Sequence, residues 1–176
     1  MSSCLTRKFP NRAHVIDSEC QVSAAFDPGN GDPNQPFTLF NAIWDTGATG
    51  SVITQHAAAA MGISPSGMTV VHGVNGQHNS PTYLVNIMLP GGVMFSGLQV
   101  TEGVLGGHYN VLIGMDIIGA GDFAVSFCGG KTVMSFRVPP GDIATDYVQQ
   151  HNDSVRRSLI KERPNSPRKK GKKGRG

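Results

Sequence analysis

At 176 residues, the chain is long enough to bury the core of one domain, and its 23 glycines, 11 prolines and 15% charged residues indicate many turns and short strands. The net charge of +3 is unevenly distributed, because residues 156–176 carry ten basic side chains against one acidic, whereas residues 1–155 carry five against eleven. Three cysteines without a short spacing exclude a disulfide framework. The lack of a long apolar run excludes a membrane-spanning helix and a secretory signal. We therefore expect a cytoplasmic protein.

After a polar N-terminal extension, residues 1–20, short apolar runs alternate with turn-forming residues. These runs predict strands at 21–26, 36–44, 49–54, 68–74, 77–89, 93–100, 104–105, 110–114, 123–127 and 131–138. A short helix is expected at 55–61, where four consecutive alanines are stopped by Gly62, and another at 115–118. This succession is typical of an all-β domain, which we place at residues 21–138.

Two segments of this domain carry specific signals. Asn75-Gly76, between two predicted strands, is the strongest short signal for a β-hairpin. The near-continuous apolar run at 110–114 is typical of a strand that is buried on both faces.

Beyond the domain, the sequence predicts a helical extension at 139–163 and a basic tail at 164–176. The helix is expected because one set of side chains falls roughly along a single face: Ile143, Tyr147, Val148, His151, Val155 and Leu159. The composition of the tail forbids a core, so we expect it to be disordered. Three interpretations of the tail stay open: a solvated charge run that improves solubility, attachment to nucleic acid or an anionic surface, or docking on the acidic body of the chain or of a partner chain.

The chemistry centres on residues 43–51, with the sequence Ile-Trp-Asp-Thr-Gly-Ala-Thr-Gly-Ser. An apolar strand ends at Asp45, a tight turn of small residues follows, and a second apolar strand comes next. This order places a carboxylate at a strand end, where Gly47 lets a backbone or a substrate approach closely.

Together with a second element at 110–116, Asn-Val-Leu-Ile-Gly-Met-Asp, this segment resembles the retropepsin family of aspartic proteases, and in particular its stand-alone bacterial members. The resemblance covers residues 21–138. It implies a catalytic role for Asp45, a hydrogen bond across the dimer axis for Thr46, and binding of substrate backbone by Gly47, with Ala48 completing the loop. The remaining positions that it implies are the core strand beside the site (Ile113, Gly114), a charged or amide position in the short helix (Asp116) and a flap over the substrate (His72, Gly73, Val74, Asn75, Gly76).

The fold implied by the resemblance is all-β, a single-lobe closed barrel with short helices that is active as a symmetric homodimer. The implied activity is that of an aspartic endopeptidase acting on polypeptides, in which two close carboxylates share one proton. One chain carries one such motif, so the active unit needs two chains. Where many relatives have an acidic residue or serine shortly after the alanine, this chain has Thr49-Gly50-Ser51.

Other interpretations compete with each of these. Asp45 could be an ordinary turn aspartate, and Asn75-Gly76 a plain surface hairpin. The six histidines lack metal-ligand spacing, so we expect no metal and no other cofactor, while His72 and His78 could line the cleft. Trp44 alternates with Asp45 on a strand and is assigned to the core. The competing functions are a non-catalytic dimeric peptide-binding module of the same fold and a nucleic-acid-binding protein that acts through its tail.

Overall fold

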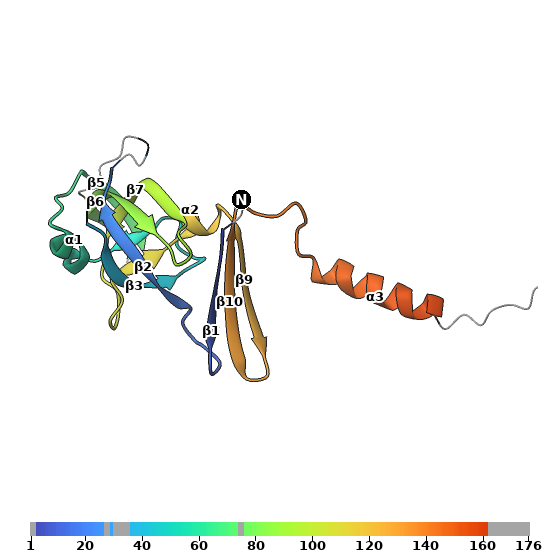
Figure 1. The fold of residues 1–176 in the computed structure, drawn as a ribbon. Helices are drawn as coiled ribbons and strands as arrows, with labels where there is room; N and C mark the ends of the chain where they lie inside the picture. Colours follow the sequence, from blue (N-terminus) through green and yellow to red (C-terminus); the bar gives the residue numbers. More distant parts are fainter. Residues whose placement is uncertain (1–2, 27–28, 30–35, 74–75, 162–176) are drawn as a thin grey trace, which may run out of the picture. The chain divides into compact units, whose positions relative to one another are not determined.

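The computed structural model describes residues 3–26, 29, 36–73 and 76–161, and its strands form two sheets (Figure 1). The chain divides into two compact units, Met1–Gly141 and Asp142–Gly176. The first unit is mainly β, with two short helices, α1 (Gln55–Met61) and α2 (Met115–Ile118). The expected β fold with short helices is therefore confirmed.

The larger sheet has seven strands in the order β2-β3-β8-β4-β7-β6-β5, and β2 also pairs with β6. Six of the strands are thus joined in a ring of pairings. The bounds of the seven are β2 (Asp17–Ala24), β3 (Thr38–Trp44), β4 (Val52–Ile53), β5 (Gly67–Gly73), β6 (Gly76–Met88), β7 (Met94–Glu102) and β8 (Val111–Ile113).

Several of these elements form where the sequence predicts them. β8 is buried along its whole length, as expected for an apolar run between two neighbouring strands, β3 and β4. Helix α1 has the predicted bounds. The Thr54 side chain caps its first turn by accepting a hydrogen bond from the Ala57 N–H, and Gly62 ends it in the left-handed conformation with a φ of 66°. The pair 104–105 is not a strand, and the Val104 side chain is fully exposed.

The smaller sheet has the order β1-β10-β9, with bounds β1 (Ser3–Phe9), β9 (Asp122–Cys128) and β10 (Lys131–Val138). The sequence does not predict β1, which pairs with β10 from Ser3 opposite Val138 to Phe9 opposite Thr132. The interpretation of residues 1–20 as an extension outside the domain is therefore corrected, since β1 and the start of β2 belong to its sheets. The sequence pattern hides this strand because only Leu5 is buried, and its neighbours are polar or charged.

The two sheets pack together around the only tryptophan of the chain. Trp44, at the end of β3, stacks on Phe123 of β9 with ring centroids 5.4 Å apart, and lies edge-on to Phe136 of β10 at 5.2 Å. Its indole N–H donates to the Ser18 hydroxyl at 3.0 Å, which satisfies the polar atom of a buried ring. Trp44 is therefore a core residue, as predicted.

The second unit contains helix α3 (Tyr147–Lys161), which lies within the predicted helical extension. Asp146 begins the helix by accepting hydrogen bonds on its side chain from the Val148 and Gln149 N–H groups. Ile143, assigned to the helix face from the sequence, precedes the helix. Among the described residues, no helix has the length and apolar character needed to span a membrane, and the basic tail 164–176 lies outside them.

Candidate active site

Asp45 lies directly after β3, and its side chain is exposed. β3 runs parallel to β8, with Trp44 opposite Ile113, and the Asp45 N–H donates to the Ile113 carbonyl at 3.0 Å. The strand pairing thus extends to the carboxylate-bearing residue itself. The backbone of Asp45 is fixed by the sheet, while its side chain is free to face solvent or a substrate.

The turn after Asp45 folds back on its carboxylate. The Gly47 N–H donates to the Asp45 Oδ1 at 2.8 Å, and the Ala48 N–H donates to the Asp45 carbonyl at 3.3 Å. A Cβ at position 47 would lie 3.2 Å from that carboxylate oxygen, so glycine allows the close approach. Asp45, Thr46, Gly47 and Ala48 therefore form one turn, as predicted, and the Thr46 side chain is exposed.

A second carboxylate, that of Asp116, holds the far end of the same loop. Asp116 Oδ2 accepts from the Ser51 N–H at 2.9 Å, and its Oδ1 accepts from the Ser51 hydroxyl at 2.8 Å. The Ser51 oxygen in turn accepts from the Gly114 N–H at 3.1 Å. Ser51 is buried and Asp116 is exposed, so these bonds join a buried position of the loop to the start of α2.

Gly114 brings the two backbones into direct contact. A Cβ at this position would lie 2.6 Å from both the carbonyl carbon and the oxygen of Gly50, and 3.0 Å from the Ser51 nitrogen. The Met115 N–H also donates to the Ala48 carbonyl at 2.8 Å. The structure thus brings the predicted residues Ile113, Gly114 and Asp116 together with the Asp45 loop. The sequence does not predict a role in the site for Ser51, which lies in the segment where the chain departs from its relatives. Its position three residues after Ala48 is the signal that places it close to the turn.

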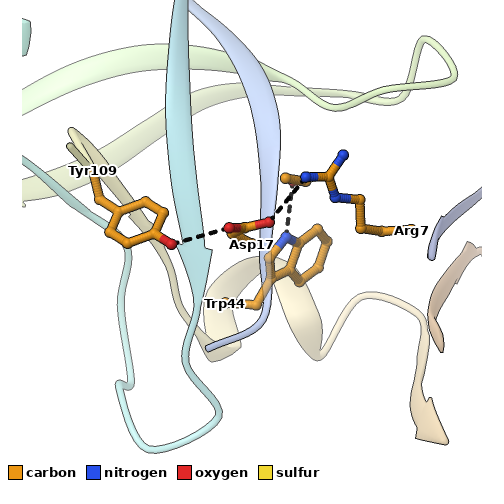
Figure 2. A network of polar contacts seen from close by, with 5 residues as sticks. Arg7, Asp17, Trp44 and Tyr109 are labelled. Carbon is orange, nitrogen blue, oxygen red and sulfur yellow. Dashed lines mark hydrogen bonds and ion pairs between the residues drawn. The ribbon is translucent and has the colours of Figure 1, made fainter. Parts of the chain in front are cut away.

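A polar network that the sequence does not predict supports the end of β3 (Figure 2). Asp17, opposite Ile43 in the sheet, accepts from the Tyr109 hydroxyl at 3.0 Å and pairs with the Arg7 guanidinium at 3.4 Å. Burial, together with this hydrogen bond, raises the pKa of the Tyr109 hydroxyl, so it stays protonated and remains a donor. Tyr109 comes 92 residues after Asp17 in the chain, so no local pattern could have joined these two side chains.

The predicted hairpin is present, formed by β5 and β6 with Gly73 opposite Gly76. The His72 ring lies within hydrogen-bonding distance of the Gln77 amide, 3.1 Å between Nδ1 and Nε2, and this contact is exposed. Val74 and Asn75 lie outside the described residues.

His78 lines a pocket whose lining residues do not include Asp45. This pocket, of about 350 Å³, is also lined by His56 of α1 and by Glu102, which accepts a 2.6 Å hydrogen bond from Tyr83. Within the described part of the chain, no group of three or more His, Cys, Asp or Glu side chains is arranged to hold a metal ion.

The Ser51–Asp116 contact gives a stability prediction. Replacing Ser51 with alanine leaves the Gly114 N–H without its acceptor in a buried site, so we expect the free energy of unfolding to fall by about 1–3 kcal/mol. Ser135→Ala is the matched control, because the Ser135 hydroxyl contacts the Thr6 hydroxyl at an exposed position of the smaller sheet. Urea denaturation of both variants measures the difference. Equal stability of the two variants would contradict the role of Ser51.

A family model described as gag-polyprotein putative aspartyl protease matches residues 35–120. No curated protein sequence matches the chain. Among solved structures, the chain is similar to a retropepsin-like aspartic protease from Rickettsia conorii, at 12% identity and a TM-score of 0.49 over 78% of this chain and 96% of that one.

Two viral proteases are also similar to the chain. For EIAV protease complexed with the inhibitor HBY-793, the identity is 18% and the TM-score 0.43, over 60% of this chain and 86% of that one. For the simian foamy virus (mac) protease, the identity is 16% and the TM-score 0.38, over 59% of this chain and 92% of that one.

The residues matched by the family model include β3, the Asp45 loop, the β5–β6 hairpin, β8 and α2. These are the elements that position Asp45 and Asp116. The resemblance inferred from 43–51 and 110–116 is therefore confirmed, since residues 35–120 match the model of this aspartyl protease family.

Proposed function

We propose that the protein is an aspartic endopeptidase whose active site contains two Asp45 carboxylates, one from each of two subunits. The observation that carries this proposal is the placement of Asp45: its side chain is exposed at the end of β3, which pairs in parallel with the buried strand β8, and its turn is held by backbone hydrogen bonds. A carboxylate fixed in this way is oriented for chemistry, not for packing.

The reaction needs one proton shared by the pair of carboxylates. The ionised Asp45 removes a proton from a water molecule, whose oxygen forms a bond to the scissile carbonyl carbon. The protonated Asp45 of the partner subunit donates to the carbonyl oxygen. The tetrahedral intermediate then breaks the C–N bond, a proton passes to the departing amine, and the carboxylate pair returns to its starting state.

A single chain supplies half of this site. The Asp-Thr-Gly triplet occurs once in the sequence, at Asp45–Gly47, so a two-lobed site within one chain has no second motif to use. Two-fold symmetry places equivalent residues on either side of an axis, and this would bring the two carboxylates together. The exposed Thr46 hydroxyl belongs to the same turn, where it would pair across the axis.

The β5–β6 hairpin would serve as the flap. Its strands pair over seven residue pairs, from Gly67 opposite Thr82 to Gly73 opposite Gly76, which makes it a long two-stranded arm. An arm of this kind, closing over an extended peptide, would exclude water other than the reacting molecule and strengthen the electrostatic interactions at the site.

The alternative function is peptide binding without cleavage. Incubation of the purified chain with a peptide library, followed by mass spectrometry, distinguishes the two. We expect new peptide ends whose appearance is blocked by an inhibitor that carries a hydroxyl group in place of the scissile carbonyl, because that hydroxyl replaces the reacting water between the carboxylates. Binding of the library without new ends would favour the non-catalytic module.

Mixing subunits tests whether the site is shared. When wild-type chains are exchanged with an equal amount of Asp45→Asn chains, random pairing leaves about a quarter of the dimers with two intact carboxylates. We expect the activity per wild-type chain to fall to about half, because half of the wild-type chains then sit in mixed dimers. Chains carrying Asp142→Asn, an exposed aspartate of the second unit, are the control and should leave the activity unchanged. Unaltered activity after exchange with Asp45→Asn chains would show that one chain holds a complete site.

A further inference from the structure

Helix α3 carries apolar side chains that are open to solvent. It is one uninterrupted helix over Tyr147–Lys161, drawn in orange in Figure 1. Tyr147, Val148 and Val155 are 73%, 70% and 43% exposed, and every other described side chain of the helix except that of Asp153 is exposed as well. A helix of this length is only marginally stable on its own in water, so a partner that buries its apolar side chains would stabilise it.

These apolar side chains share one face of the helix. A residue advances about 100° around an α-helix, so positions 147, 148 and 155 fall within about 100° of one another, and we call them the apolar face. The opposite side of the helix carries the polar and charged residues Gln149, Gln150, Asp153, Arg156 and Arg157, with Ile160 among them. The helix is therefore amphipathic.

The second unit is also basic, in contrast to the first. Residues 142–176 carry ten basic side chains against four acidic ones, whereas residues 1–141 carry five against eight. All ten basic residues of the second unit follow Val155, beginning with Arg156 and Arg157 on the polar side of α3. The apolar face is thus followed along the chain by a concentrated positive charge.

The apolar face and the positive charge together select among three candidate partners. Nucleic acid would satisfy the basic side chains through its phosphates, but it would leave the apolar face in water. A second copy of the helix would bury the apolar face, but it would bring two basic units together, and like charges repel. A membrane with anionic lipids presents negative headgroups directly above an apolar layer, which matches both properties.

We propose that α3 binds the surface of a membrane that contains anionic lipids. The helix axis lies in the plane of the interface, with Tyr147, Val148 and Val155 turned toward the acyl chains. Arg156 and Arg157 remain among the headgroups, and the tyrosine hydroxyl lies at the boundary, where a ring with one polar end is favoured. This inference is independent of the proposed function, because no residue of the Asp45 site takes part in it.

Sedimentation of the full chain with lipid vesicles tests the nature of the partner. We expect the chain to pellet with vesicles of phosphatidylcholine and phosphatidylserine, and to stay in the supernatant with vesicles of phosphatidylcholine alone, whose headgroups carry no net charge. Raising the salt concentration from about 0.05 M to about 0.5 M should weaken the binding by about tenfold or more, because salt screens the attraction. Equal binding to both kinds of vesicle would overturn the proposal.

Serine substitutions separate the apolar face from the charge. Val148→Ser/Val155→Ser removes both valines of the face and leaves the charge unaltered, so we expect the partition coefficient onto phosphatidylserine vesicles to fall by about tenfold. Ile160→Ser is the matched control, since Ile160 is 69% exposed on the polar side and serine has a helix propensity similar to those of valine and isoleucine. It should bind as the unaltered chain does. Equal binding by all three proteins would show that charge alone attaches the chain, and the assignment of the apolar face would then be wrong.

Competition distinguishes lipid from nucleic acid. Duplex DNA is added to the vesicle-bound chain at a phosphate concentration equal to that of the phosphatidylserine. We expect most of the chain to remain on the vesicles, because DNA offers no apolar layer for α3. Displacement of the chain by DNA would identify nucleic acid as the stronger partner and overturn the proposal. The cleavage of a soluble peptide by Asp45 does not involve α3, so failure here would leave the proposed protease standing.

Discussion

We expect the Asp45→Asn variant to lose peptide-bond hydrolysis altogether, by at least about 10³-fold, because the substitution removes the ionisable group from both halves of the site at once. An amide can neither take a proton from the attacking water nor donate a shared proton to the carbonyl. The amide oxygen that replaces the Asp45 Oδ1 can still accept the hydrogen bond from the Gly47 N–H, which is 2.8 Å long in the unaltered protein, so the turn is expected to keep its shape.

The fold of this variant is checked independently of its activity. The fluorescence of Trp44 reports the packing of the residue next to the substitution, since its ring stacks on Phe123. We expect an unchanged emission spectrum and an unchanged dimer dissociation constant. Asp142→Asn, which removes an exposed carboxylate from the second unit, should retain full activity. Cleavage by purified Asp45→Asn protein at the wild-type rate would refute the assignment.

The second large effect is expected at Gly114. A Cβ there would lie 2.6 Å from the Gly50 carbonyl group and 3.0 Å from the Ser51 nitrogen, all of them backbone atoms that cannot rotate away. Gly114→Ala therefore has to displace the loop that carries Asp45. A displacement of about 1 Å at a reacting group costs on the order of 100-fold in rate. Overpacking of this buried position should also lower the free energy of unfolding by about 1–3 kcal/mol.

The control for Gly114 is another glycine of the same chain. An added Cβ at Gly106 meets nothing within 4 Å, so Gly106→Ala should change neither activity nor stability measurably. Steady-state cleavage rates and urea denaturation of both variants separate the effects. If Gly114→Ala retained wild-type activity, the loop would have to tolerate the shift, and the rigid positioning of Asp45 inferred from its contacts would be wrong.

The parts of the fold that the sequence predicts well are those with a strong local pattern. The alanine run of α1 between Thr54 and Gly62 has both of its caps within the sequence. The apolar run of β8 has no polar position that could face solvent, and its burial follows from that alone. Asp45 and its turn are recognisable from residue order, because the chemistry requires small residues beside the carboxylate.

The parts that the sequence does not predict depend on contacts between distant residues. β1 becomes a strand by pairing with β10, and its own sequence shows a single buried side chain, Leu5. The Ser51–Asp116 bonds join residues that are far apart in the chain, and neither residue type identifies the other as its partner. Asp17 and Tyr109 likewise meet only once β2 and the loop before β8 are in place.

The most direct test of a shared active site measures mass and activity on the same samples of the full chain. Sedimentation gives the fraction of dimer at each protein concentration, and peptide cleavage gives the activity per chain. We predict that activity per chain falls on dilution in proportion to the dimer fraction and approaches zero for the monomer. Constant activity per chain in samples that sediment as monomers would contradict a site made of two Asp45 carboxylates.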